Sequence, residues 1–492
     1  MIASHTRRMA YPAPQDLVQQ EPKLDYLFHP RSIAFIGIGT DRLDHLRDFY
    51  LTPILKFGFD GKIYLVNPKG GNIMGFKVYP DIKDIPGPVD YAIVGIPARL
   101  CPDLLRDCIV KGVKTVSFWT AGFSEIGETA LEAEIIEIAR RGGIRVLGPN
   151  CTGIYYCPKA KLSCFEDFPK ESGTVGFFCQ SGGNCIQLVN VASNRGARFS
   201  KVVGYGNACD LNESDFLDYF AQDTDTKIIT GYIEGIKDGQ RFIKTLAKAA
   251  QVKPVILVKA GHTEAGARGA ASHTGSMAGS ESAWDAIFKQ LGVIRVYSLE
   301  ELGDMIVTFL FMSRPQGRKA VIIGLGGGNS VLNADQCENN GLIAPSLPPE
   351  IRDKLREFTP DAGNILRNPI DSQVVWGNPE DFLNTVKIVS EWEGTDMVIR
   401  CAPTPDDLPA PAKRQTLYQM IIEAILHSRE TCQKPMAAVI APGRRSEFVE
   451  WTVSAQQQLA AAGYPVYPTV ARAAKAISRF IDYHNNHQRE TG

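Results

Sequence analysis

Short runs of apolar, β-branched residues alternate with amphipathic stretches along most of the chain. The runs are almost continuously apolar, which is typical of strands buried on both faces of a parallel sheet. The stretches between them, such as residues 131–141, carry apolar residues at helical spacing. The alternation predicts an α/β fold made of three consecutive doubly wound parallel-sheet units, a Rossmann-like unit followed by two flavodoxin-like units.

Each unit has its own set of predicted strands. In the first unit they cover residues 33–38, 63–66, 91–96, 113–118 and 144–147; in the second 175–179, 201–204, 228–233, 255–258 and 293–296; in the third 320–323, 397–399, 436–440 and a short strand around Val466. The predicted divisions are an N-terminal extension over 1–27, units over 28–150, 151–313 and 318–485, and a tail over 486–492. We expect the last helix to cover 471–483 and the polar residues after it to fray.

The composition narrows the class of protein. The chain has 492 residues, 44% hydrophobic and 22% charged, which fits about three globular domains. Its formal net charge is −1 without blocks of like charge, which argues against nucleic-acid or membrane-surface binding. A secretory signal and a run long enough to span a membrane are both absent, so we expect a cytoplasmic protein. The 11 cysteines form no CxxC pair and no Cys/His cluster, so we expect free thiols and no metal site.

Unusual loops follow several predicted strands of the second unit, where a doubly wound sheet binds its ligands. After residues 175–179 the chain continues with Gln180 and then with Ser181, Gly182, Gly183 and Asn184. Ser181 is a good N-cap, and a helix that begins here would present free N–H groups and partial positive charge to a phosphate. Glycine-rich turns between a strand and a helix are also common packing features, so this motif is weak by itself.

A long loop rich in Gly, Ala and Ser covers residues 261–279 and has no apolar period. We expect neither a core strand nor a stiff helix here, but a mobile loop that presents one side chain. His262 and His273 can each act as nucleophile and proton carrier near neutral pH, and His273 lies deeper among the small residues. Glu234, at a predicted strand end, could orient the ring. Histidines in polar loops are usually only solvated, so the residues alone leave this role open.

Longer motifs resemble the NDP-forming acyl-CoA synthetases, relatives of succinyl-CoA synthetase. The resemblance runs from about Leu27 to the C-terminus and is carried by the segments SHTGSMAGS, AWDAIFKQLGVIRV, GPNCTGI, CQSGGN, YIEGIKDG, AGFSEIG and GLGGGNSVLNADQCE and by the turn Asn368-Pro369-Ile370-Asp371. It implies that ATP, CoA and a carboxylic acid give acyl-CoA, ADP and phosphate through an acyl phosphate. His273 matches the family's phosphohistidine, Glu234 the glutamate that contacts it, and Ser181, Gly182 and Gly183 the helix start that holds its phosphoryl group.

CoA would bind the first unit. The candidate contacts lie at strand ends and at the turn that closes the unit: Gly37, Gly39, Thr40, Asn67, Pro68, Lys69, Pro97, Asn150 and Cys151. A surface lysine such as Lys69 is usually only solvated. Asn150 and Cys151 resemble the family turn near the CoA thiol, and a purely structural turn is the alternative.

The sequence departs from the family pattern in two ways. Residues 37–46 are bulkier than the usual glycine loop and include two aspartates, which fit a phosphate poorly, although Thr40 or Arg42 could compensate. An ATP-grasp segment is also missing, and Gly326-Gly327-Gly328 is better explained as a tight turn. We therefore expect ATP/ADP and Mg²⁺ on a separate ATP-grasp β-type subunit, in a hetero-oligomer of two plus two chains.

Two other classes of protein compete with a synthetase subunit. One is a non-catalytic acyl-CoA-binding or assembly homologue, which the altered first loop favours and the intact histidine motif opposes. The other is an acyl or carbamoyl transferase on the same fold. The acid itself is not specified: Phe118, Trp119, Tyr155, Tyr156, Phe177 and Phe178 line a pocket for a bulky or aromatic acid, or they belong to the core.

Overall fold

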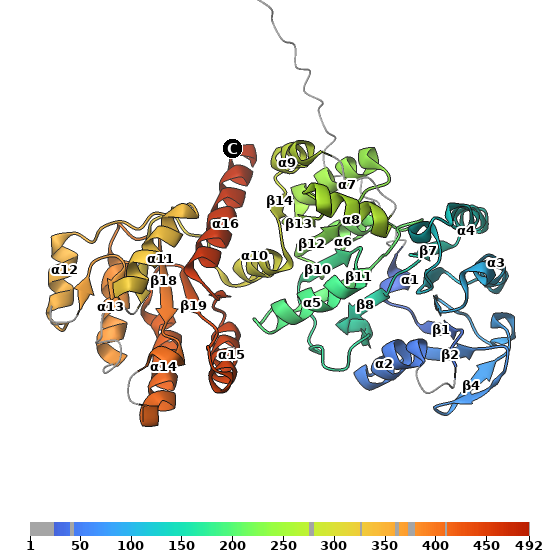
Figure 1. The fold of residues 1–492 in the computed structure, drawn as a ribbon, viewed down its shortest axis with the longest axis horizontal. Helices are drawn as coiled ribbons and strands as arrows, with labels where there is room; N and C mark the ends of the chain where they lie inside the picture. The colour runs from blue at the N-terminus through green and yellow to red at the C-terminus, as the bar shows by residue number, and fades with distance from the viewer. Residues whose placement is uncertain are drawn as a thin grey trace, which may run out of the picture.

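A computed structural model describes residues 24–39, 44–274, 280–324, 327–359, 364–371, 379–408 and 411–491, with backbone alone at 271–274, 327 and 488–491. Three α/β units follow one another along the chain (Figure 1). The prediction of three consecutive α/β units is therefore confirmed. Each sheet is mainly parallel but ends in an antiparallel edge that the sequence pattern did not predict.

The first sheet has the order β3-β4-β2-β1-β5-β6-β7, so the strand order reverses between β1 and β5. Strand β1 is buried along its whole length, which explains its unbroken apolar sequence. The strands are β1 Ser32–Ile36, β2 Lys62–Val66, β3 Gly71–Ile73, β4 Phe76–Tyr79, β5 Tyr91–Val94, β6 Thr115–Phe118 and β7 Arg145–Leu147. The helices are α1 Asp25–Phe28, the π-helix η2 Arg47–Leu51, α2 Thr52–Phe57, η3 Ile82–Asp84, η4 Ala98–Leu100, α3 Cys101–Lys111, η5 Ser124–Ile126 and α4 Thr129–Gly142.

The second sheet has the order β14-β13-β12-β10-β11-β8-β9. The predicted strands are all present, and β8 and β9 extend the sheet through a stretch where no strand was predicted. The strands are β8 Gly153–Cys157, β9 Leu162–Ser163, β10 Val175–Cys179, β11 Phe199–Gly204, β12 Ile228–Ile233, β13 Val255–Lys259 and β14 Ile294–Val296. The helices are η6 Pro158–Ala160, α5 Gly182–Ser193, α6 Glu213–Gln222, α7 Gly239–Val252, α8 Glu264–Thr274, α9 Glu281–Gln290 and α10 Leu299–Phe311.

The third sheet has the order β16-β17-β15-β18-β19-β20, which is the flavodoxin-like arrangement. Its strands are β15 Ala320–Gly324, β16 Ile365–Leu366, β17 Ile370–Asp371, β18 Met397–Ala402, β19 Met436–Ile440 and β20 Val466–Tyr467. Its helices are α11 Gly327–Asn339, α12 Pro349–Arg356, α13 Pro379–Glu391, η8 Pro405–Asp407, η9 Pro411–Lys413, α14 Arg414–Thr431, α15 Ser446–Ala461 and α16 Val470–Thr491.

The polar C-terminal tail does not fray as we expected, because α16 continues to Thr491. The ring of His487 lies 4.0 Å from that of Tyr483, and His484 packs edge-on against Phe480 at 4.5 Å. His487 also lies where a Cβ on Gly292 would meet it at 3.0 Å. The tail thus packs against the second unit, a contact that its polar composition does not reveal.

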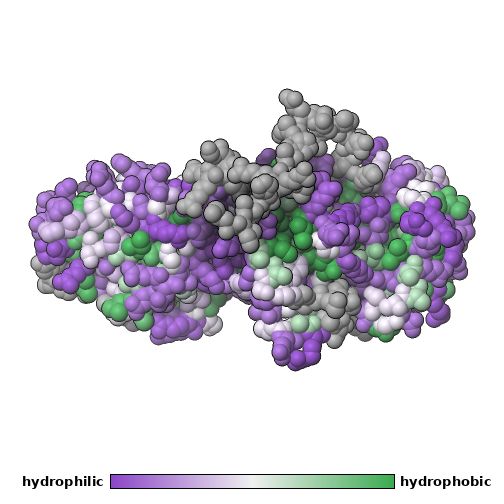
Figure 2. All heavy atoms as spheres, turned by 90° about the horizontal axis from the view of Figure 1, so that it is seen from above, coloured by the Kyte–Doolittle hydropathy of each residue, from purple (hydrophilic) through white to green (hydrophobic). Residues whose placement is uncertain are grey.

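The units share apolar cores. One core joins α10 of the second unit to α16 of the third, and Figure 1 shows both helices between the two sheets. Another core joins the first and second units, where the ring of Phe28 stacks on Tyr219 at 4.7 Å. The face in Figure 2 is mainly hydrophilic, with apolar side chains in small separate groups. Within the described residues, every helix is too short or too polar to cross a bilayer.

Candidate active site

Helix α5 begins directly beyond the carboxyl end of β10. Ser181 is its N-cap, and the Ser181 hydroxyl accepts a hydrogen bond from the backbone N–H of Asn184 at 3.4 Å. A Cβ on Gly182 would lie 2.9 Å from the Thr152 side chain, whereas a Cβ on Gly183 would meet nothing within 4 Å. The glycine at 183 is therefore not required for internal packing and leaves the helix end open. The predicted helix start is confirmed, and phosphate binding by these residues stays a prediction.

Glu234 is held beside this helix end. It follows β12 and is buried, and its backbone N–H donates to the side-chain oxygen of Gln180, as does the N–H of Gly235 at 3.0 Å. The Tyr232 hydroxyl interacts with both the Glu234 carboxylate and the Asn184 side chain. Burial, and then the charge of Glu234, raise the pKa of Tyr232. The structure thus brings together the carboxylate and the helix start that the sequence predicted to cooperate.

A buried lysine lies behind Glu234. Lys259 ends β13, is 2% exposed, and donates from Nζ to the Glu234 carbonyl at 2.7 Å. Its ammonium lies 5.3 Å from the centroid of the Trp284 ring. Burial, and after it the charge of Arg295, lower the pKa of Lys259 to about 8. Sequence reasoning passed over Lys259 because lysines at strand ends are normally solvated; its place at the same sheet edge was the available signal.

The segment after β13 is a helix where we expected a mobile loop. The Thr263 hydroxyl accepts from the N–H of Gly266 at 3.1 Å, so it caps α8. Alanine, glutamate and arginine are strong helix formers, and a surface helix needs no apolar period. His273 lies in the last turn of α8, but its side chain and residues 275–279 lie outside the described residues. The predicted contact between His273 and Glu234 stays a prediction.

Helix α8 also lies against η5 of the first unit. The histidine-bearing helix therefore lies close to the predicted CoA-binding unit as well as to the edge of its own sheet. His262 precedes α8, is exposed, and has its ring 5.7 Å from that of Tyr297. Because His262 lies in the same segment but outside α8, it serves as a control for His273.

The predicted CoA contacts of the first unit lie at the carboxyl ends of β1, β2 and β5. Gly37 has φ +97° and a Cβ there would lie 2.7 Å from the Gly95 carbonyl, so only glycine fits. The Asn67 side chain donates to the Ile38 carbonyl at 2.8 Å and accepts from the Lys69 N–H at 3.0 Å. Asn67 therefore braces the loop. Pro68 and Lys69 complete this turn, Pro97 precedes η4, and Thr40 lies outside the described residues.

Asp44, one of the two aspartates that depart from the family pattern in this loop, is hydrogen-bonded to the loop backbone. The Asp44 carboxylate accepts from the Gly39 N–H at 2.7 Å and from the Arg47 N–H at 2.8 Å. In a glycine loop that binds phosphate, such N–H groups are free for the ligand. Here a carboxylate of the chain itself occupies them, which fits the expectation that this loop suits a phosphate poorly.

The Asn150 and Cys151 turn is mainly structural in its described contacts. It follows a cis Gly148-Pro149 bond, and Asn150 has φ 54°. Cys151 is buried with its sulfur 3.5 Å from the Ser117 hydroxyl, and burial raises the pKa of the Cys151 thiol to about 11. The thiol is therefore protonated at neutral pH. A CoA contact made by the backbone of this turn stays a prediction.

A polar junction joins the first unit to the second. Asn207 is 2% exposed and donates to the Glu125 carboxylate at 2.6 Å and to the Glu132 carboxylate at 3.2 Å. Lys237, four residues from the strand that leads to Glu234, pairs with Glu132 at 3.0 Å. Glu125 belongs to η5, against which α8 lies. One hydrogen-bonded group therefore links the CoA-side loop to the loop of Glu234, and the histidine helix α8 lies beside it.

Family comparisons agree with this arrangement. A model described as a CoA binding domain matches residues 31–156, and one described as a succinyl-CoA ligase like flavodoxin domain matches residues 172–309. The alpha subunit of ADP-forming acetate–CoA ligase I from Pyrococcus furiosus is 34% identical over 467 residues, covering 92% of this chain and 96% of that protein. The chain belongs to the ADP-forming acyl-CoA ligase family.

A solved member of this ligase family has the same fold. The dinucleotide forming acetyl-coenzyme A synthetase 1 of Ca. Korarchaeum cryptofilum, in complex with phosphate and ADP, gives a TM-score of 0.78 at 32% identity, covering 94% of this chain and 97% of that chain. The ADP-forming acetate–CoA ligase of Methanocaldococcus jannaschii is 38% identical over 356 residues, which is 71% of this chain but 49% of that ligase. Some members of the family therefore match this chain over almost their whole length, whereas others are about twice as long as the part that matches.

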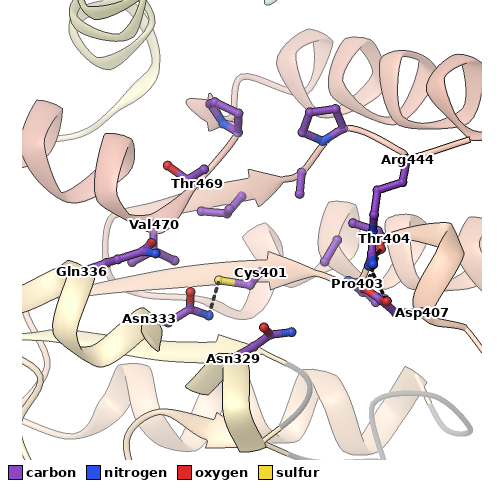
Figure 3. Close-up of a pocket in the computed structure, with 15 residues that line it drawn as sticks. Asn329, Asn333, Gln336, Cys401, Pro403, Thr404, Asp407, Arg444, Thr469 and Val470 are labelled. Carbon is purple, nitrogen blue, oxygen red and sulfur yellow. Dashed lines mark hydrogen bonds and ion pairs between the residues drawn. The ribbon is translucent and has the colours of Figure 1, made fainter. Parts of the chain in front are cut away.

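The third unit of this ligase-family chain has a cleft of about 470 Å³ at the carboxyl ends of β18, β19 and β20 (Figure 3). Asn329, Asn333 and Gln336 of α11 enter it from one side. On the other side Arg444 donates to Thr404 at 3.2 Å and pairs with Asp407. This pairing neutralises the arginine, so the lining suits neutral polar groups.

Gly327 and Gly328 begin α11, and Gly326 lies outside the described residues, so the predicted tight turn is replaced by a helix start.

Most of the aromatic residues proposed for an acid pocket belong to the core. Phe118, Tyr155, Tyr156, Phe177 and Phe178 are buried, so the pocket interpretation is wrong for them. Their backbones lie within strands covered on both faces, which leaves their rings no access to a ligand. Trp119, one residue beyond β6, is only partly buried.

Among the described residues, no group of three His, Cys, Asp or Glu could hold a metal ion.

Proposed function

We propose that this chain is the CoA-binding, phosphohistidine-carrying subunit of an ADP-forming acyl-CoA synthetase, with His273 as the phosphoryl carrier. The observation that carries the proposal is the position of α8. This helix starts beyond β13, next to the strand end that leads to Glu234, and lies against η5 of the predicted CoA-binding unit. A histidine on it can serve a phosphate held at α5 and an acyl group held by the first unit.

The chemistry divides one reaction into three transfers. A nitrogen of His273 attacks the γ-phosphorus of ATP and releases ADP; a carboxylate oxygen of the acid then attacks that phosphorus and frees the histidine as acyl phosphate forms. The CoA thiolate attacks the acyl carbon and expels phosphate. Glu234 accepts a hydrogen bond from the second ring nitrogen, and the N-terminus of α5 stabilises the phosphoryl charge. The described position of Glu234, beside Asn184, supports these roles.

We assign ATP/ADP to an ATP-grasp β-type subunit, because the Pyrococcus relative that this chain covers to 96% is named an alpha subunit. Mg²⁺ would accompany the nucleotide there, and no step is assigned to it here. A hetero-oligomer of two plus two chains is the expected assembly.

The test is the reverse half-reaction, which needs no ATP-grasp partner. The purified chain is incubated with inorganic phosphate and a panel of acyl-CoAs, and its intact mass is measured. We expect a gain of one acid-labile phosphoryl group, lost in His273→Ala and retained in His262→Ala, which changes a histidine of the same segment. The acyl-CoA that supports phosphorylation also identifies the acid.

The bond from Gly39 to Asp44 is the observation that favours the alternative, a non-catalytic acyl-CoA-binding homologue. If the chain binds CoA but stays unmodified even with an ATP-grasp partner and ATP, the synthetase proposal is wrong and this alternative replaces it. Phosphorylation that persists in His273→Ala would assign the carrier to another residue. An acyl or carbamoyl transferase would turn over acyl groups without any phosphorylated intermediate.

A further inference from the structure

An exposed group of aromatic rings lies beyond the carboxyl edge of the first sheet. His45 and Phe49 follow the first glycine loop, and their ring centroids are 5.8 Å apart with the planes 26° from parallel. The ring of Trp119 lies 5.0 Å from His45, at 32°. Phe49 is 48% exposed. Single apolar side chains on a surface are ordinary, but three adjoining rings whose outer member is half-exposed form a surface on which a further ring can pack.

The local backbone explains why these rings meet. Phe49 lies in the π-helix η2, a rare element that often marks functional sites. Leu46, just before η2, packs where a Cβ on Gly95 would meet it at 3.0 Å, so this segment lies over the end of β5. Trp119 follows β6, the next strand of the sheet. The group therefore covers the ends of two neighbouring strands at the ligand-binding edge.

Trp119 also adjoins the turn that the family resemblance places near the CoA thiol. The Phe118 carbonyl accepts from the N–H of Cys151 at 3.3 Å, and the Thr120 carbonyl accepts from the N–H of Asn150 at 2.9 Å. Trp119 thus stands between two residues that hold this turn. The opposite side of the β1–β5 crevice carries the Asn67 turn, after β2. Trp119 lies on the β6 side, away from that turn and towards the predicted thiol end, and His45 lies against it.

We propose that His45, Phe49 and Trp119 bind the ring of an aromatic carboxylic acid, so that the acyl group used by this chain is an aryl or arylalkyl group. The proposal rests on the function proposed above, because it places the acyl group at the thiol end of bound CoA. A flat ring laid on Phe49 would extend this group of adjoining rings and remove the exposed face from water. A small aliphatic acyl group has no comparable surface to offer.

Calorimetric titration of the purified chain with CoA, acetyl-CoA and benzoyl-CoA tests this without a partner subunit or turnover. We expect the natural chain to bind benzoyl-CoA more tightly than acetyl-CoA. Phe49→Ala should weaken benzoyl-CoA about two- to tenfold, the range expected for losing one ring pair, and leave CoA and acetyl-CoA unchanged. Phe49→Tyr should restore the preference. Val110→Ala, at a 77% exposed position on α3, is the matched control.

The other outcomes are equally distinct. Equal weakening of all three ligands by Phe49→Ala would show that the rings contact CoA itself, and the inference would be wrong. An unchanged benzoyl-CoA affinity in Phe49→Ala would also overturn it and leave a protein partner as the occupant of these rings. Binding of CoA by the natural chain without preference for benzoyl-CoA overturns the inference alone. A natural chain that binds none of the three overturns the proposed function as well.

Discussion

The side-chain oxygen of Gln180 accepts a hydrogen bond from the backbone N–H of Glu234, and this contact joins the ends of the neighbouring strands β10 and β12. The same oxygen accepts from the N–H of Gly235. Gln180 directly precedes Ser181, the N-cap of α5. A single buried amide therefore sets the position of the proposed carboxylate relative to the proposed phosphate site.

Gln180→Leu should damage both stability and chemistry. It leaves the N–H groups of Glu234 and Gly235 buried without an acceptor, so we expect the free energy of unfolding in urea to fall by about 2–4 kcal/mol. Phosphorylation of His273, followed by intact mass, should slow at least about tenfold because Glu234 is displaced. Gln180→Glu keeps an acceptor of the same shape but buries a second carboxylate near Glu234, so its loss of stability should shrink as the pH is lowered. Wild-type stability in Gln180→Leu would show that other contacts hold Glu234.

The buried Lys259 predicts a stability gradient at alkaline pH. Burial lowers the folded-state pKa of this amine to about 8 from 10.5, so the unfolded chain binds more protons between these values. The free energy of unfolding should therefore rise as the pH rises from about 8 to about 10.5. Lys259→Met should flatten that rise in urea titrations. Lys253, whose pKa burial also lowers to about 8, remains in both chains, so the difference between them isolates Lys259. Identical slopes would refute this assignment.

Asp44→Asn should tighten CoA binding. The carboxylate now bonded to the Gly39 N–H places negative charge where a CoA phosphate would approach. Asparagine can still accept from the Arg47 N–H, so the start of the following helical segment is kept while the charge is removed. We expect CoA affinity, measured by calorimetry, to increase about three- to tenfold at low salt, with a smaller gain at 0.5 M salt. Asp48→Asn, one turn further along the exposed surface, is the control and should change the affinity little.

The apolar runs predicted the central parallel strands well because both faces of each strand are buried. The hairpin strands β3 and β4 and the edge strand β9 were missed, because they are short and their composition is mixed. Strand β8 was missed although it is buried along its whole length. The helix α8 was missed for the opposite reason. Its sequence has good helix formers but no apolar face, so periodicity gives no signal. Contacts with another unit, such as His487 against Gly292, are also invisible to local pattern.

For the candidate site, sequence reasoning succeeded where a residue's chemistry and its place at a strand end coincide. Ser181 and Glu234 are such residues. Gln180, Tyr232 and Lys259 were missed as participants because their roles depend on partners from other strands. The aromatic residues show the reverse error: position near a strand end suggested a pocket, but alternation along buried strands sends those rings into the core. His45 and Phe49, which remain exposed, lie in the loop that departs from the family pattern.

Glu301→Gln should weaken the attachment of the third unit. Glu301 of α10 pairs with Lys475 at 2.6 Å and Arg479 at 2.8 Å, both on α16. Burial alone would raise the pKa of Glu301, but these cations outweigh it and the pKa is lowered. The lowered pKa means that this contribution is present at neutral pH and is lost as the pH falls below about 4. We expect Glu301→Gln to lower the free energy of unfolding, measured in urea, by about 1–2 kcal/mol at pH 7. The difference between the two chains should disappear in acid. Glu300→Gln, at the exposed neighbouring position, should cost less.

Asn207 predicts a pH-dependent defect at the junction between the first and second units. Its amide nitrogen donates to the carboxylates of Glu125 and Glu132, and the residue is buried. Asn207→Asp keeps the size of the side chain but replaces the amide donor with a carboxylate, which then faces two groups of the same charge. We expect the free energy of unfolding at pH 7.5 to fall by about 3–5 kcal/mol, which is the cost of an unpaired buried charge. Asn207→Ala loses only the hydrogen bonds and should cost about 1–3 kcal/mol.

The two variants of Asn207 should diverge as the pH is lowered. Like charges and burial raise the folded-state pKa of the introduced carboxyl group above its unfolded value, so the folded Asn207→Asp chain takes up a proton first. Its deficit in urea unfolding should therefore shrink between pH 7.5 and pH 5, whereas the deficit of Asn207→Ala should stay constant. Hydrogen exchange at the amides of η5 should accelerate in both, because Glu125 loses the hydrogen bond from Asn207. If the loss in free energy of unfolding of Asn207→Asp does not change with pH, the three carboxylates must have moved apart. The contact between the first and second units would then be able to rearrange.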